Sequence, residues 1–180
     1  MPPKLQILLV EDSPHDAELV VRELRRAGFD FEWKRVETEA DFLSHLHEGL
    51  DLILSDFKMP QFNGLRALEL LKERGLDVPF IIVSGSIGED IAVAAMKQGV
   101  ADYLLKDRLA RLGLSVSHAL EEGRLRRERR RDEDKIKNQL RELQRWHEAT
   151  LGREERILEL KQEINQLLIQ QNQPPRYASH

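Results

Sequence analysis

The sequence LQILLVED, residues 5–12, is an almost unbroken apolar run followed at once by two carboxylates. Short apolar runs of this kind are typical of strands in a parallel sheet, which is covered on both faces. The next residues, Ser13 and Pro14, are a helix-start signal, and apolar side chains then recur at helical spacing until Gly28. One strand followed by one helix is therefore the first step of the predicted fold.

The same alternation continues along the chain to about residue 120. Further strands are predicted over residues 32–36, 52–56, 80–83 and 102–105, and further helices over residues 38–48, 65–74 and 90–98, with a fifth helix starting near Arg108. Five strands that alternate with five helices predict an α/β fold, an open, doubly wound parallel sheet over residues 1–120. Ligands of such sheets bind outside the carboxyl ends of the strands.

The strand signals stop after residue 120, and a helical pattern replaces them. No proline stands between Pro79 and Pro174, so the fifth helix can continue without a break. Two apolar seams have coiled-coil spacing, namely Ile136, Leu140 and Leu143, and then Ile157, Leu160, Ile164 and Leu167. The two seams do not share a register, so we expect a stammer or stutter between them, around residues 146–156. We predict a helical coiled coil over residues 121–170 and a disordered tail over residues 171–180.

The composition excludes several classes of protein. The 180 residues carry a net charge of −4 and contain no cysteine, which excludes disulfides and thiolate metal sites. The arginine-rich stretch 124–131 has acidic neighbours and no aromatic residue for base stacking, so no nucleic-acid binding is expected. No apolar run is long enough for a signal peptide or a membrane span, and we expect a soluble, cytoplasmic protein.

Polar side chains follow four of the predicted strands. They are Glu11 and Asp12 after the first strand, Asp56 after the third, Ser84 after the fourth and Lys106 after the fifth. Three carboxylates at one sheet edge repel each other unless a cation is present, and oxygen ligands of this kind suit magnesium, which also takes phosphate oxygens. The pocket suits a phosphoryl group, with Asp56 as nucleophile and with Ser84 and Lys106 contacting phosphoryl oxygens.

These motifs resemble those of the receiver domain of two-component response regulators. They are LLVED at residues 8–12, LSDFKMP at residues 54–60 with Gly64, VSG at residues 83–85 and YLLK at residues 103–106. The match covers roughly residues 4–120. Each motif alone is weak, but their order on successive strand ends is specific. The resemblance implies a flavodoxin-like fold.

The resemblance also implies a role for each matching residue. Asp56 is the residue that a histidine kinase or phosphotransfer protein phosphorylates, and Lys106 pairs with the phosphoryl group. Glu11, Asp12, Asp56 and the backbone carbonyl of Lys58 hold Mg²⁺.

Two further positions form the switch that the resemblance implies. Ser84 moves towards the phosphoryl group, and Tyr103 then turns inward. The side chains at the positions of Lys58 and Ser86 influence how long the phosphoryl group survives. One departure is Asp107, which stands where many receivers have a proline after the lysine.

The expected molecule is a phosphoacceptor switch rather than an enzyme, although it assists its own phosphorylation and dephosphorylation. Residues 146–168 resemble the helical linkers of bacterial sensor kinases, which are parallel dimeric coiled coils, so we expect a homodimer through this helix. Two alternatives remain open. The chain is the receiver and linker part of a larger hybrid sensor kinase, or it is an adaptor whose coiled coil binds a partner constitutively. A magnesium-dependent aspartyl phosphatase needs a second acid where Lys58 stands.

Overall fold

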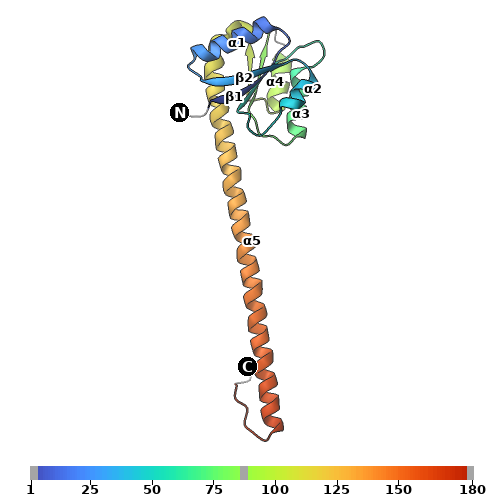
Figure 1. Ribbon diagram of the computed structural model, residues 1–180, viewed down its shortest axis with the longest axis vertical. Coiled ribbons are helices and arrows are strands. Elements are labelled where there is room, and N and C mark those ends of the chain that lie inside the picture. Colours follow the sequence, from blue (N-terminus) through green and yellow to red (C-terminus); the bar gives the residue numbers. More distant parts are fainter. Residues whose placement is uncertain (1–3, 86–88, 178–180) are drawn as a thin grey trace. The chain divides into compact units, whose positions relative to one another are not determined.

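Strands and helices alternate along the first two thirds of the computed structural model, which describes residues 4–85 and 89–177. The strands are β1 (Leu5–Val10), β2 (Phe31–Val36), β3 (Leu52–Asp56), β4 (Phe80–Ser84) and β5 (Asp102–Leu105). The helices are α1 (Pro14–Arg26), α2 (Glu39–His45), α3 (Gly64–Glu73), α4 (Glu89–Lys97), the 3₁₀ helix η1 (Lys106–Arg111) and α5 (Leu112–Gln170) (Figure 1).

The five strands form one parallel sheet in the order β2-β1-β3-β4-β5. Every residue of β3 and β4 is buried, because helices cover both faces of the sheet. The chain adds β2 on one side of β1 and then adds β3, β4 and β5 on the other side, so the sheet is doubly wound. The carboxyl ends of β1 and β3 lie next to each other at the point where the direction changes. The predicted fold class, a flavodoxin-like sheet with helices on both faces, is confirmed.

Alternate side chains of each strand enter two separate cores. Leu8 and Val10 of β1 pack in the core beneath α2, α3 and α4, whereas Ile7 and Leu9 pack in the core beneath α1 and the beginning of α5. The period of two along the strands explains this separation. Figure 1 shows the two layers of helices on opposite sides of the sheet. Both cores consist of apolar side chains, which leaves the ends of the strands as the place for polar groups.

Two helix boundaries differ from the sequence prediction by more than one residue. The second helix was predicted to reach Glu48, but α2 ends at His45, because Leu46 has an extended backbone with a ψ of 117°. The fifth α-helix was predicted to start near Arg108. A 3₁₀ turn occupies this stretch instead, with Arg108 in a non-helical conformation, and α5 begins at Leu112. The short 3₁₀ turn directly follows β5 and places Lys106 at its first position.

Gly64 allows the start of α3 to pack closely on the end of β3. A β-carbon at this position would lie 2.8 Å from the backbone oxygen of Asp56, which is closer than such contacts come in proteins. The side chain of Asn63 caps the helix by accepting a hydrogen bond from the backbone N–H of Arg66. The loop from β3 to α3 is thus held directly against the residue predicted to be phosphorylated.

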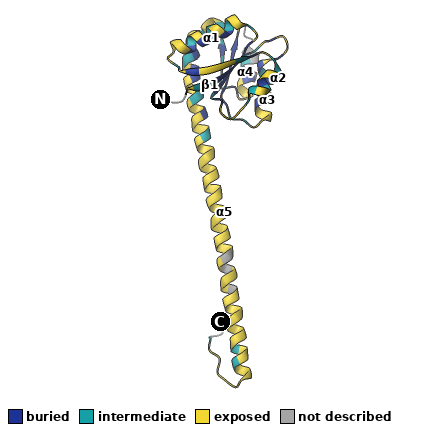
Figure 2. Ribbon diagram, viewed as in Figure 1, coloured by how far each residue is buried: buried dark blue, intermediate teal, exposed yellow. Residues whose placement is uncertain are grey.

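The chain forms two compact units, residues 1–128 and residues 129–180. The helix α5 extends into the second unit, where nearly all described side chains are exposed (Figure 2). These include the side chains of both predicted seams. Pairing of the seams in a coiled coil stays a prediction.

Residues 171–177 turn back along the last turns of α5. The side-chain oxygen of Asn165 accepts hydrogen bonds from the backbone N–H groups of Arg176 and Tyr177, and its amide donates to the carbonyl oxygen of Tyr177. Disorder was predicted for the whole tail from residue 171, and the last three residues of that tail, 178–180, lie outside the described part of the chain.

None of the helices in the described residues is long and apolar enough to cross a bilayer.

Candidate functional site

The register of the sheet brings the predicted site residues to one edge. Val10 of β1 lies opposite Ser55 of β3, so Glu11 and Asp12 emerge beside Asp56. Ser84 of β4 lies opposite Leu105 of β5, and Lys106 follows directly. The structure therefore brings together the polar residues that the sequence placed at four strand ends.

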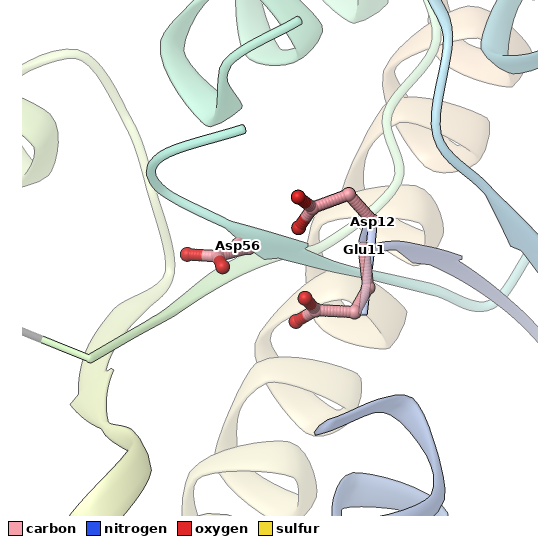
Figure 3. A group of neighbouring side chains, drawn as sticks. All are labelled: Glu11, Asp12 and Asp56. Atoms are coloured by element: carbon pink, nitrogen blue, oxygen red, sulfur yellow. The ribbon is translucent and has the colours of Figure 1, made fainter. Parts of the chain in front are cut away.

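Three carboxylates form a cluster at this edge. One side-chain oxygen from each of Glu11, Asp12 and Asp56 lies within 4.8 Å of the others. Figure 3 shows the three carboxylates directed to the same side of the strand ends. Glu11 is 2% exposed and Asp56 is 8% exposed, whereas Asp12 is exposed to solvent. The cluster is thus buried on one side and open on the other.

The ammonium group of Lys106 contacts carboxylates from three different elements. Its Nζ atom lies 2.9 Å from Oε2 of Glu11, 2.8 Å from Oδ2 of Asp56 and 2.6 Å from Oδ2 of Asp16. An ammonium group has three N–H donors, so all three have a carboxylate within reach. Lys106 nevertheless supplies only one positive charge to a site that contains four carboxyl groups.

The carboxyl group of Glu11 and the ammonium group of Lys106 respond differently to this environment. Burial raises the pKa of Glu11 from 4.5 to about 7, although the hydrogen bond from Lys106 opposes the rise. Burial lowers the pKa of Lys106, but its hydrogen bonds to Asp16, Asp56 and Glu11 outweigh that effect and raise the pKa above the usual value. Lys106 therefore stays protonated, and the protein itself only partly neutralises the acidic cluster.

The residues at this edge fit a magnesium ion. Carboxylate oxygens at this spacing are the ligands that hard divalent cations prefer. Burial is the main cause of the raised pKa of Glu11, and the nearby charge of Asp56 adds to it, although Lys106 opposes the rise. Backbone of the following loop also lies close, since the N–H of Lys58 donates to Oδ1 of Asp56 at 3.2 Å. The role of the Lys58 carbonyl oxygen as a further magnesium ligand stays a prediction.

The two predicted switch residues occupy neighbouring strands. Ser84 is buried at the end of β4. Tyr103 is half-buried on β5, where it packs against the core beneath α2, α3 and α4, and its ring centroid lies 6.3 Å from that of Phe57. Their movement on phosphorylation stays a prediction, and Ser86 lies outside the described residues.

Two residues of this edge were missed by the sequence analysis. Asp16, in the first turn of α1, contacts Lys106. Arg35, near the end of β2, donates from Nη1 to the backbone oxygens of Glu11 (2.8 Å) and Asp12 (3.2 Å). The available signals were the spacing from Asp12 to Asp16, which is one helical turn, and the place of Arg35 at the end of a strand.

The sheet order and the acidic, lysine-paired edge define the class of protein, which is a flavodoxin-like α/β domain with an acidic cluster at the carboxyl ends of its strands. Residues 7–115 match the family described as the response regulator receiver domain. This stretch is more than half of the chain, so the chain belongs to the response regulator receiver family of two-component systems. The family predicted from the sequence motifs is thus confirmed.

Similar proteins include regulators from several organisms. The response regulator protein FleR of Pseudomonas aeruginosa is 36% identical over 118 residues, which cover 64% of this chain and 24% of FleR. The C4-dicarboxylate transport transcriptional regulatory protein DctD of the same species is 29% identical over 167 residues, covering 90% of this chain and 34% of DctD. The chain thus spans about a third or less of the length of these two relatives.

Solved structures of receiver domains have the same fold. The signal receiver domain of a LuxO repressor protein from Vibrio parahaemolyticus superimposes with a TM-score of 0.61 at 27% identity, covering 69% of this chain and 95% of that chain. The response regulator StyR superimposes with a TM-score of 0.65 over 76% of this chain and 69% of its own, and at 24% identity it shows the fold alone.

Proposed function

We propose that this chain is a response regulator that accepts a phosphoryl group on Asp56 in a magnesium-dependent reaction. The donor is a histidine kinase or a phosphotransfer protein. The observation that carries the proposal is the position of Asp56, whose carboxylate is nearly buried, lies within 2.8 Å of the Lys106 ammonium group and belongs to the acidic cluster with Glu11 and Asp12.

The reaction is an in-line transfer between two side chains. An oxygen of Asp56 forms a bond to phosphorus while the phosphorus–nitrogen bond of the donor's phosphohistidine breaks, and the released imidazole takes a proton from solvent. Magnesium, when bound, neutralises negative charge on the phosphoryl oxygens. Lys106 donates to a phosphoryl oxygen, and the Ser84 hydroxyl donates to another. Water later hydrolyses the acyl phosphate and returns Asp56 to its starting state.

In this reaction the domain is a reactant and a switch, rather than an enzyme that turns over a substrate. Positioning and charge neutralisation at the sheet edge are what the protein contributes. The hydrogen bonds of Asp56 support this view, because one carboxylate oxygen accepts from the backbone N–H of Lys58 and the other accepts from the ammonium group of Lys106. The carboxylate is thus held in a fixed orientation.

We propose further that the signal leaves through α5 into a parallel homodimeric coiled coil. The support is that α5 is helical to Gln170 and that its second seam is exposed. The exposed fractions of these residues range from 39% to 58%, in Ile157, Leu160, Ile164 and Leu167. Apolar residues at heptad spacing are stabilised when a second helix buries them. A second copy of the chain supplies such a helix in the matching register.

The phosphorylation proposal is tested with a small-molecule phosphoryl donor. Incubation with acetyl phosphate and magnesium should add the mass of one phosphoryl group to the intact protein, and removal of magnesium by EDTA should prevent this. Asp56→Asn should abolish the addition. Asp30→Asn is the matched control, because Asp30 is exposed in the turn before β2. Labelling that persists in Asp56→Asn would contradict the proposal.

The dimer proposal is tested by light scattering on a sizing column, with magnesium, with and without beryllofluoride. Wild type should elute with the mass of two chains in at least one state. Ile164→Asp, which places a charge in the seam, should give the mass of one chain in both states. Glu163→Asp, at a neighbouring exposed position, is the control. A monomeric wild type in both states would contradict the proposal.

A further inference from the structure

Asp16 belongs to an element that the acidic cluster does not otherwise use. It lies in the first turn of α1, whose start is fixed by Pro14 in the first turn and by the Ser13 side chain, which accepts a hydrogen bond from the backbone N–H of Asp16. The carboxylate of Asp16 is half-buried and reaches the site from this helix, and its Oδ2 atom lies 2.6 Å from Nζ of Lys106. This is the shortest of the three carboxylate contacts of Lys106.

The three contacts of Lys106 are not equivalent. Asp56 is the proposed acceptor, and its carboxylate loses its negative charge when one of its oxygens forms the bond to phosphorus. Glu11 belongs to the acidic cluster that fits a cation, and a bound cation competes with Lys106 for its oxygens. Asp16 has neither task, because it is not a member of that cluster. Its contact with Lys106 is therefore the one that can persist through metal binding and phosphorylation.

A lysine side chain has four rotatable bonds, and ordering it costs conformational entropy. Lys106 is the residue that must place one N–H donor on a phosphoryl oxygen. In the phosphorylated protein, the N–H group of Lys106 that now donates to Asp56 would donate to the phosphoryl group on Asp56. Another contact then has to hold the ammonium group in place. The carboxylate of Asp16 supplies this contact from outside the reacting atoms.

We infer that Asp16 is a positioning residue for Lys106, which it holds in the orientation that the phosphoryl group requires. This inference rests on the proposed function and adds a residue to it. Asp16 does not touch the phosphoryl group or the cation, so its effect reaches the reaction only through Lys106. Loss of Asp16 should therefore loosen Lys106 in every state, but it should weaken binding of the phosphoryl group and not the affinity for magnesium alone.

The first test measures beryllofluoride binding at saturating magnesium, and magnesium binding alone, in the full chain. Asp16→Ala should weaken beryllofluoride binding by roughly three- to tenfold, since a charge-assisted contact is lost at a partly exposed position, and should leave magnesium affinity within about twofold. Asp16→Asn keeps an oxygen acceptor and should lie between wild type and Asp16→Ala. Glu18→Ala is the control, because it removes a carboxylate from the same helix at an exposed position.

The second test needs neither magnesium nor a phosphoryl mimic. The ¹⁵N resonance of the Lys106 ammonium group should be observable in metal-free wild type at low temperature, because hydrogen-bonded ammonium protons exchange slowly with water. It should broaden or shift in Asp16→Ala and stay unchanged in Glu18→Ala. A loss of stability alone would not produce this selective change.

The outcomes separate this inference from the proposed function. Unchanged beryllofluoride binding in Asp16→Ala, or tighter binding in Asp16→Asn than in wild type, would overturn the role of Asp16. The second result would mean that Asp16 acts mainly as an extra negative charge against the phosphoryl group. Failure of wild type to accept a phosphoryl group from acetyl phosphate would instead overturn the proposed function, while the ammonium resonance would still report whether Asp16 holds Lys106.

Discussion

Glu11→Gln should stabilise the metal-free protein, and the gain should grow with pH. The side chain of Glu11 is 2% exposed, and its pKa is raised from 4.5 to about 7, chiefly by burial. A raised carboxyl pKa means that the folded protein binds this proton more tightly than the unfolded chain does. The resulting stabilisation is fully present below about pH 4.5 and is lost as the pH rises through about 7. Glutamine has nearly the same shape and does not ionise.

The size of the effect follows from the two pKa values. A pKa that rises from 4.5 to about 7 corresponds to about 3 kcal/mol over the whole pH window, at about 1.4 kcal/mol for each pKa unit. About 2.5 kcal/mol of this lies between about pH 5 and about pH 8. The difference in unfolding free energy between Glu11→Gln and wild type should therefore increase by about 2.5 kcal/mol from the lower to the higher pH. All other titrating groups are common to both proteins and cancel in this difference.

The assay is urea unfolding in EDTA at several pH values. Trp33 lies in β2 and Trp146 lies in the second unit, so both proteins should carry Trp146→Phe, which leaves Trp33 to report on the receiver. A second measurement is the pH titration of the Glu11 carboxyl carbon by NMR. If the stability difference is flat within about 0.5 kcal/mol between about pH 5 and about pH 8, burial does not control the charge of Glu11 and the reasoning fails.

Three further predictions concern the same edge of the sheet. Magnesium at about one hundred times its Kd should raise the unfolding free energy of wild type by about 2.7 kcal/mol at about pH 8, measured by urea titration. At the same magnesium concentration Asp12→Asn should gain less, and EDTA should reverse the gain in both proteins. Arg35→Met should weaken magnesium binding roughly three- to tenfold by calorimetry, because the backbone oxygens of Glu11 and Asp12 lose their donor, while Arg35→Lys should lose less; equal affinity in all three proteins would exclude this role. Gly64→Ala should cost about 1–3 kcal/mol of stability, since the new β-carbon meets the backbone of Asp56, whereas Gly85→Ala meets open space and should cost less.

The sequence predicted the centre of the sheet well, because β1, β3 and β4 are short apolar runs with a polar residue at or directly after their end. Parallel strands covered on both faces tolerate few polar side chains, so the runs in β1, β3 and β4 are distinct from the helices around them. The end of α2 was less predictable. Leu46 suits a helix as well as a loop, and its extended backbone is set by tertiary structure rather than by local preference.

The predicted site residues were those whose position follows from strand order alone. Glu11, Asp12, Asp56 and Lys106 each stand next to a strand end, and parallel pairing brings such ends together. Asp16 and Arg35 belong to the same edge for another reason. Asp16 pairs with a lysine 90 residues away, and Arg35 binds backbone oxygens of the residues that follow the neighbouring strand. The local spacing of Asp16 and the place of Arg35 at a strand end are weak signals, because neither identifies the distant partner.

Charge balance connects the separate features of this edge. Four carboxyl groups lie at this edge, those of Glu11, Asp12, Asp16 and Asp56. Lys106 contacts all of them except that of Asp12, and burial raises the pKa of Glu11 to about 7. A divalent cation and a proton compete for Glu11, so magnesium binding should release a proton and should strengthen as the pH rises through about 7. The same competition explains why the lysine needs a partner outside the acidic cluster. When the cation takes the oxygens of Glu11, the contact with Asp16 remains and keeps Lys106 directed at Asp56.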